Sequence, residues 1–344
     1  MLLCLLNFFQ HLILAMNTFG RIFKVTIYGE SHSSYVGITI DGVPAGISLA
    51  PNDFTTELSR RKSGAFATTQ RTENDISIVT SGVFNDKTTG TPLNIVFENN
   101  NIDSANYTIE QYNKPRPGHT DFVSLHKYFG FADYRGSGHF SGRLTVALVA
   151  AGVVARKVFP CSVNTKIIEI GGQQDYQHLL NQAVEEGDSL GGVLETVIND
   201  VPIGLGEPFF DSVESLISHI VFSIPGAKAI EFGAGFNSAK MFGSEYADSI
   251  INSDGTTNTN NCGGVIGGIT NGNNIVFRTA FHPPVSIRKK LQTYNFENKA
   301  IDEIQTSGRH DSCYVLRVPP IIDACVSIVL ADLYLIRQTQ ILQK

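Results

Sequence analysis

The chain has 344 residues, of which 42% are hydrophobic and 17% are charged, and its formal net charge is −6. This composition is typical of a water-soluble globular protein with enough apolar residues for a sizeable core. The negative charge argues against a nucleic-acid-binding protein, and any anionic ligand would need a local concentration of Arg and Lys. Five scattered cysteines without a CxxC pair favour reduced thiols, a cytoplasmic location and the absence of a structural zinc site.

Residues 1–15 (MLLCLLNFFQHLILA) are strongly apolar but lack the basic start of a secretory signal. The run is short for a membrane span and is interrupted by Asn7, Gln10 and His11. Met16 follows directly and leads into an amphipathic strand. We therefore expect residues 1–15 to be an extension outside the fold, with a targeting segment as the alternative. Residues 16–344 are expected to form one domain that does not enter a membrane.

Secondary-structure elements can be predicted in chain order from the short apolar runs and from the Gly, Pro and Asp residues that separate them. Strands are predicted at 23–28 and 36–40, a short helix at 54–62, and further strands at 76–84 and 93–98. An almost wholly apolar helix at 144–159 must be buried on most faces. An exposed helix at 178–186, a strand at 193–198, a Gly/Asn-rich segment at 252–274 and a second apolar helix at 320–335 follow. The pattern predicts an α+β fold with helices between sheets.

Polar loops punctuated by glycine carry the chemically distinctive residues. They are GESH at 29–32, RRK at 60–62 with TTQR at 68–71, RPGHTD at 116–121, YRGSGHFSGR at 134–143 and GRHD at 308–311. Glycine lets the backbone approach a ligand closely, and arginine binds phosphate or carboxylate through two hydrogen bonds. Histidine transfers protons near neutral pH. These loops predict an enzyme for a small polyanion that carries phosphate, with His acid–base chemistry.

Plainer interpretations exist for each loop. A lone histidine in a turn is commonly a cap or a solvated side chain, and three basic residues at a helix end commonly form a solvated face. The GxGxxxG spacing at 136–142 does not fit a dinucleotide-binding fingerprint. A metal site would combine loop histidines with Asp121 or Asp311, but no HxH or HxxxH spacing supports one. A binding module that keeps the anion pocket without turnover stays open as the alternative.

The same strings, in the same order, resemble the motifs of the chorismate synthase family. The resemblance comprises TFG at 18–20, FKV at 23–25, GESH, RPGHTD, YRGSGHFSGRLT at 134–145, NCGGVIGGITNG at 261–272 and GRHDSC at 308–313. It runs from Met16 to about Ile336. It implies a β-α-β sandwich, in which a helical layer lies between antiparallel sheets, and assembly as a homotetramer.

The resemblance also implies a reaction, the last step of the shikimate pathway to aromatic amino acids. Family members remove phosphate and a ring proton from 5-enolpyruvylshikimate 3-phosphate by a 1,4-anti elimination, which makes them carbon–oxygen lyases. They need reduced FMN (FMNH2), which is thought to lend an electron transiently, although there is no net redox change. Bifunctional members reduce their own flavin in an NADP-linked step. Because this chain is short and has no added domain, we expect the monofunctional form, served by an external flavin reductase or electron donor.

Residue roles follow from the same resemblance. His119 matches the histidine that protonates reduced flavin near its N1, and His32 matches the histidine placed at the substrate phosphate. Asp311 and Ser31 match residues that relay the substrate ring proton. The substrate anions would be bound by Arg61, Lys62, Arg71 and Arg143. FMN would be contacted by His139, Phe140, Ser141, Pro225, Gly226, Gly267, His282, Pro283, Pro284, Val285, Ser286 and Arg309.

Overall fold

The structure is a computed structural model that describes residues 16–105, 107–108, 112–306, 308 and 310–340. The predicted extension at 1–15 therefore lies outside the described residues. One antiparallel sheet has the strand order β1 (Thr18–Phe19), β2 (Lys24–Gly29), β3 (Tyr35–Asp41), β7 (Leu93–Glu98), β4 (Ile78–Ser81). Every second residue along β7 is buried, and Val36, Ile38 and Ile40 of β3 are buried in the same way. One face of this sheet therefore belongs to the core.

A second antiparallel sheet has the order β10 (Ala227–Phe232), β13 (Ile275–Phe281), β9 (Gly192–Asn199), β8 (Ser162–Ile170). Its central strands also alternate between buried and half-buried positions, with Leu194 and Ile198 of β9 and Phe277 of β13 fully inside. Each sheet thus presents one apolar face that must be covered by another layer.

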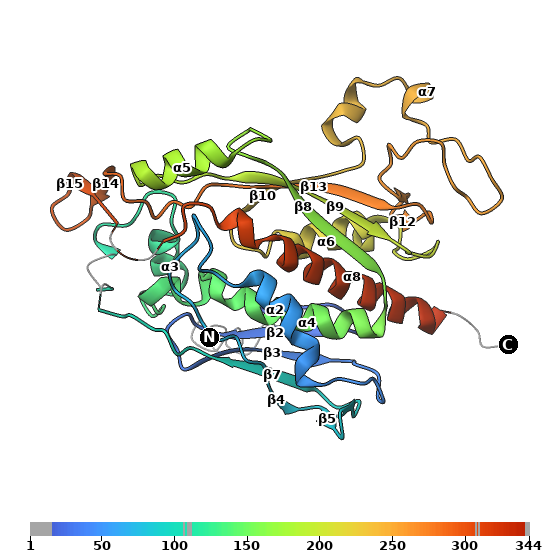
Figure 1. The fold of residues 1–344 in the computed structure, drawn as a ribbon, viewed down its shortest axis with the longest axis horizontal. Helices are drawn as coiled ribbons and strands as arrows, with labels where there is room; N and C mark the ends of the chain where they lie inside the picture. The colour runs from blue at the N-terminus through green and yellow to red at the C-terminus, as the bar shows by residue number, and fades with distance from the viewer. Residues whose placement is uncertain (1–15, 106, 109–111, 307, 309, 341–344) are drawn as a thin grey trace, which may run out of the picture.

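Two long apolar helices, α4 (Thr145–Val158) and α8 (Pro319–Gln340), supply that cover. Helix α4 packs on β3 and β7, α8 packs on β8 and β9, and the helices pack on each other between the sheets (Figure 1). A Cβ atom on Gly152 would overlap Ala324, so glycine permits the close crossing. The stretch Arg135–Val158, which ends with α4, and the helix α8 are long and apolar enough to cross a membrane, but 78% of each apolar window is buried inside the protein. They are the core helices of this fold.

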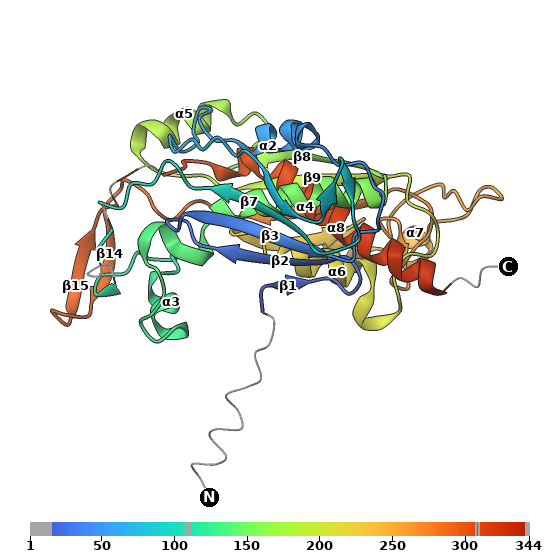
Figure 2. The same ribbon diagram turned by 90° about the horizontal axis from the view of Figure 1, so that it is seen from below.

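The remaining elements are shorter and lie around this core. The helices and helical turns are η2 (Pro51–Phe54), α2 (Thr55–Arg61), α3 (Asp121–Lys127), η4 (Arg135–Phe140), η5 (Gly142–Leu144), α5 (Gln177–Glu186), η6 (Phe209–Asp211), α6 (Val213–Val221), η7 (Gly235–Lys240), α7 (Gly243–Tyr246) and η8 (Tyr314–Arg317). The hairpins are β5 (Val83–Phe84) with β6 (Lys87–Thr88), β11 (Val265–Ile266) with β12 (Ile269–Thr270), and β14 (Leu291–Asn295) with β15 (Ala300–Ile304). The β14–β15 hairpin and α3 lie at one end of the molecule, and α7 lies at the other (Figure 2).

The predicted mixture of helices and antiparallel strands is confirmed, with both apolar helices and the strand at 93–98 in place. The prediction of one continuous strand at 76–84 is wrong, because the structure has two short strands there. The chain turns at Gly82, which has a φ of +86°, and the segment divides into β4 and β5. Strands β8, β10 and β13 are additional to the predicted ones.

Candidate functional site

A cavity of about 910 Å³ opens where the first turns of α4 and α8 meet. This volume is near the upper end of the range of small-molecule pockets, about 300–1,000 Å³. Thr145 and Leu148 line it from α4, Ile321 lines it from the first turn of α8, and Val318 lines it from the residue before α8. Because the N-terminus of a long helix carries a partial positive charge, both core helices favour a negative charge in this cavity.

Charged side chains strengthen that preference. Among the described residues, six cationic side chains and three carboxylates line the cavity, a formal excess of three positive charges in a chain of net charge −6. The cations are Arg61, Lys62, Arg71, Arg116, Arg143 and Arg317, and the carboxylates are Glu73, Asp75 and Asp311. The local basic site that we expected in this acidic protein therefore lies in this cavity.

Arg61 and Arg143 form one buried cluster with Asp75. Arg61 Nη1 lies 3.1 Å from Asp75 Oδ2, and Arg143 Nη1 donates to Asp75 Oδ1. Arg61 Nε also donates to Thr145 Oγ1 at 3.0 Å, which ties the end of α2 to the start of α4. Burial lowers the pKa of Arg61 to about 9, against the raising effect of Asp75. Two guanidinium groups share one carboxylate, so the cluster keeps a net positive charge at the cavity wall.

Arg71 holds the GESH loop at the cavity. Its Nη1 donates to Ser31 Oγ at 2.9 Å and its Nη2 donates to the Ser31 carbonyl at 3.1 Å, while Glu73 pairs with the same guanidinium at 2.7 Å. The Ser31 N–H donates to the carbonyl of Gly138 at 3.0 Å. The GESH loop and the 134–143 loop, far apart in the sequence, are thereby joined.

His119 is the centre of a partly buried hydrogen-bond network. Its Nδ1 lies 2.7 Å from Asp121 Oδ1 and its Nε2 lies 3.1 Å from Ser137 Oγ. Arg116 binds both oxygens of Asp121 at 2.8 Å and donates to Ser286 Oγ at 3.0 Å. Burial alone would raise the pKa of Asp121, but the hydrogen bonds from Arg116 and His119 outweigh it and hold this pKa well below its usual range. The pKa of His119 is lowered, chiefly by burial, so the neutral imidazole is favoured.

His32 lies behind the 136–138 loop and is not among the described residues that line the cavity. Its Nδ1 is 2.8 Å from Ser104 Oγ, and its ring meets Tyr107 edge-on. A Cβ on Gly136 would come within 2.5 Å of His32 Nε2, so only glycine fits there. Burial lowers the pKa of His32, and Arg71 and Arg135 lower it further. Its predicted role at a substrate phosphate stays a prediction.

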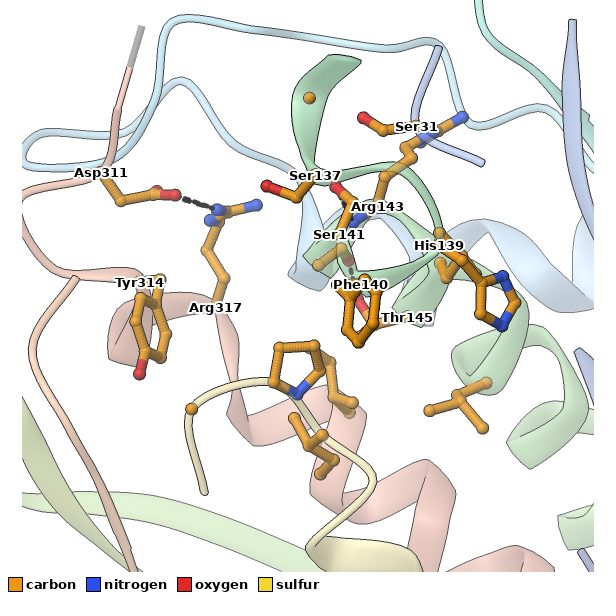
Figure 3. A pocket seen from close by; sticks show the side chains of 18 of the residues that line it. Ser31, Ser137, His139, Phe140, Ser141, Arg143, Thr145, Asp311, Tyr314 and Arg317 are labelled. Carbon is orange, nitrogen blue, oxygen red and sulfur yellow. Dashed lines mark hydrogen bonds and ion pairs between the residues drawn. The ribbon is translucent and has the colours of Figure 1, made fainter. Parts of the chain in front are cut away.

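Asp311 faces the cavity from the segment that precedes α8. Arg317 Nη2 donates to both of its oxygens, at 2.8 and 2.7 Å, and the Thr69 N–H donates to Oδ1 at 2.9 Å. Figure 3 shows this pair on one side of the pocket, with His139 on the opposite side. The buried Nε of Arg317 has no hydrogen-bond partner among the described residues, which leaves a donor for a ligand.

Most residues predicted to contact a cofactor also line the cavity: His139, Phe140, Ser141, Pro225, Gly226, His282, Pro284, Val285 and Ser286. His139 Nδ1 donates to the Gly29 carbonyl at 2.8 Å. The Tyr314 hydroxyl donates to the His282 carbonyl and occupies the space that a side chain on Gly226 would need. Pro283 and Gly267 are not among the described cavity residues, and Gly267 lies in the β11–β12 hairpin turn. The predicted Arg309 lies outside the described residues.

Sequence reasoning missed several cavity residues, most clearly Arg317, Asp75 and Ser137. Ser137 lies inside the 134–143 loop that the sequence singles out, but no pattern in that loop marks its hydroxyl as functional. Asp75 lies in a polar stretch with no distinguishing pattern, and Arg317 lies just before the predicted apolar helix. Within the described residues, no group of three or more His, Cys, Asp or Glu side chains could hold a metal ion.

Comparisons with known proteins agree on one family. The model of the chorismate synthase family matches residues 23–335. A chorismate synthase of Chitinophaga pinensis is 52% identical over 94% of this chain and 98% of its own length. Those of Dehalococcoides mccartyi and Pyrococcus abyssi are 42% and 40% identical, over 93% of this chain and 96% and 98% of their own lengths. A crystal structure of chorismate synthase aligns with a TM-score of 0.69 over 93% of each chain, at 24% identity, and shows the same fold.

Proposed function

Since the chain belongs to the chorismate synthase family, we propose that it converts 5-enolpyruvylshikimate 3-phosphate to chorismate with the aid of reduced FMN. The observation that carries the proposal is the cavity, in which an excess of three positive charges meets the N-termini of two core helices. The reaction is a 1,4-anti elimination of phosphate and a ring proton, so the chain would be a carbon–oxygen lyase acting on phosphate.

The substrate carries a phosphate and two carboxylates, and the cavity offers donors for such groups. Arg71 and Lys62 line it from the segment after α2, and the Arg61–Asp75–Arg143 cluster lines it beside the start of α4. Arginine forks match the geometry of these anions, and burial strengthens the interaction. These residues would bind and orient the substrate.

The residues present fit reduced FMN. Phe140 and Pro225 give the wall apolar surface for a flat ring system, and Arg317 Nε is a buried donor without a partner among the described residues. His139, Ser141, Gly226, His282 and Pro284–Ser286 would hold the cofactor at the cavity. When bound, reduced FMN supplies the transient electron density that makes expulsion of phosphate feasible.

Proton transfer falls to the chain's own side chains. Asp311 is a carboxylate oriented by Arg317 and by the Thr69 N–H, and we assign to it, with Ser31, the removal of the substrate ring proton. His119 is partly buried, held in one orientation by Asp121, and is the group we assign to protonation of the cofactor. His32 would support the departing phosphate from behind the 136–138 loop.

We also propose a cellular location, an oligomeric state and a source of electrons for this reaction. The enzyme would act in the cytoplasm as a homotetramer in the shikimate pathway. An external flavin reductase or electron donor would supply the reduced cofactor, as expected of a monofunctional member.

The decisive experiment is turnover. Purified protein, incubated anaerobically with chemically reduced FMN and 5-enolpyruvylshikimate 3-phosphate, is expected to release equal amounts of phosphate and chorismate. Omission of the reductant serves as the control and should abolish both products. If folded protein bound FMN but released neither product, the alternative of a non-catalytic binding module would replace this proposal.

A further inference from the structure

Ser137 has an unusual backbone conformation in the middle of the candidate site. Gly136, Ser137 and Gly138 have φ values of +55°, +69° and +51° in succession. Glycine adopts this left-handed region readily, whereas a serine there is strained. The turn nevertheless carries a hydroxyl at its centre, and that hydroxyl lines the cavity.

The partner of this hydroxyl is the Nε2 atom of His119, at 3.1 Å. The Nδ1 atom lies 2.7 Å from Asp121 Oδ1, and Asp121 is a carboxylate bound through both oxygens by Arg116. Since a carboxylate only accepts hydrogen bonds, Nδ1 carries the proton and Nε2 of the neutral ring is an acceptor. Ser137 therefore donates its hydroxyl proton to Nε2 when His119 is neutral.

Protonation of His119 reverses this hydrogen bond. The imidazolium Nε2–H then donates to Ser137 Oγ, and the hydroxyl hydrogen of Ser137 becomes free to point into the cavity. Both ring nitrogens of His119 are occupied in either state, one by Asp121 and one by Ser137. A proton cannot pass from His119 to a ligand in the cavity without Ser137 taking part or moving aside.

We propose that Ser137 is the relay through which His119 exchanges a proton with the bound ligand, an inference that rests on the proposed function. In one direction, the bond between Ser137 Oγ and its hydrogen breaks as a basic atom of the ligand takes that hydrogen. The Oγ atom accepts the proton from His119 Nε2 at the same time. One proton moves from imidazolium to ligand, Ser137 is regenerated, and no electrons change hands.

The test deletes the hydroxyl without disturbing the turn. Ser137→Gly suits a φ of +69°, so the variant should fold at least as well as the wild type. Ser223→Ala is the matched control, because Ser223 also lines the cavity but donates to the Ile220 carbonyl instead of to a histidine. Ser137→Ala is a second deletion that does not depend on glycine's flexibility.

The first measurement needs no ligand. In ¹⁵N NMR titrations, His119 Nε2 of the Ser137→Gly variant is expected to shift toward the value of a pyridine-type nitrogen that accepts no hydrogen bond. The pKa of His119 should fall, since the imidazolium loses a charge-assisted acceptor while Arg116 and Asp121 remain beside it. The Ser223→Ala variant should match the wild type.

The second measurement is anaerobic turnover. Ser137→Gly should lower kcat by about 10- to 100-fold, the lower part of the range for general acid–base catalysis, because water replaces the hydroxyl imperfectly. KM should stay within about two-fold. An unchanged kcat would overturn the relay even if the Nε2 resonance shifted, because the shift reports only the contact between His119 and Ser137. If the wild type made no chorismate, the proposed function would fail, whereas the NMR shift would still report on the His119–Ser137 contact.

Discussion

Arg61 and Arg143 are neighbours in space with one carboxylate between them. Asp75 is 2% exposed at its side chain, and each of its oxygens accepts from a different arginine. Its backbone has a φ of +52°, an uncommon value for a residue other than glycine. The sequence predicted both arginines at the site but not Asp75, since only the fold brings position 75 between positions 61 and 143.

Replacement of Asp75 tests the importance of this shared carboxylate. Asp75→Ala leaves two buried guanidinium groups facing each other without their anion, so the free energy of unfolding should fall by roughly 3–5 kcal/mol, as for other broken buried ion pairs. Urea unfolding at pH 7 measures the change. Asp175→Ala, at an exposed aspartate, is the control and should change stability little. Equal stabilities of the two variants would mean that solvent, and not Asp75, compensates the arginines.

At the scale of elements, the two core helices were the most predictable part of the fold. Their apolar runs are too long and too uniform for anything but a buried helix. Strand β8 was missed because its alternation is broken by a register shift between Ile167 and Glu169. Strand β13 alternates cleanly between buried and half-buried residues. Its period of two is present in the sequence, directly after the Gly/Asn-rich segment at 252–274.

Helix α8 also fixes the start of the first sheet through a single side chain. Asp332, which is buried in α8, accepts hydrogen bonds from the backbone N–H groups of Arg21, Ile22 and Phe23 at 2.9, 2.7 and 2.8 Å. These residues immediately precede β2. The carboxylate therefore holds the second half of α8 to the segment before β2, across more than 300 residues of sequence.

Loss of this clamp should be costly. Asp332→Ala removes the acceptor of three N–H groups, and the free energy of unfolding is expected to fall by about 3 kcal/mol. Hydrogen bonds to charged groups contribute about 1.5–3 kcal/mol each, and part of the loss is offset because Arg21 is exposed to solvent. Chemical denaturation provides the measurement. Glu303→Ala, which breaks an exposed pair with Lys290, should have little effect by comparison. A similar small loss for both variants would show that the N-terminal strand is held by other contacts.

On the scale of the whole molecule, the site depends on contacts between loops that sequence cannot pair. GESH joins the 134–143 loop through Ser31, RPGHTD joins the 282–286 loop through Arg116, and the segment after GRHD joins the 65–71 segment at the Ala67 carbonyl. The motifs predicted which loops matter because each contains glycine with Arg or His. Their partners follow from the layered packing that brings distant loops to the first turns of α4 and α8.

One part of the molecule extends away from this core. Residues 234–261 leave the second sheet and return to it, with the Ala234 N–H bonded to the Asn261 carbonyl at 2.8 Å, and they project at one end of the molecule (Figure 1). Phe236 and Phe242 are 80% and 77% exposed on this excursion, and Ile250 and Ile251 are also exposed. Large apolar side chains gathered on a projecting segment are typical of a protein–protein contact, and the proposed homotetramer offers other copies of the chain to cover them.

The oligomeric state tests this assignment. By size-exclusion chromatography with light scattering, the wild type is expected to show a mass near four times the 37.5 kDa of one chain. The double variant Phe236→Ser/Phe242→Ser should have a lower mass with an unchanged far-ultraviolet circular dichroism spectrum, because the excursion adds nothing to the buried core. Phe84→Ser, at a phenylalanine that is 71% exposed on the β5–β6 hairpin, is the control and should keep the wild-type mass. A monomeric wild type would contradict the tetramer itself. A double variant with the wild-type mass would place the contact on another surface, because the aromatic side chains of 234–261 would then be dispensable for assembly.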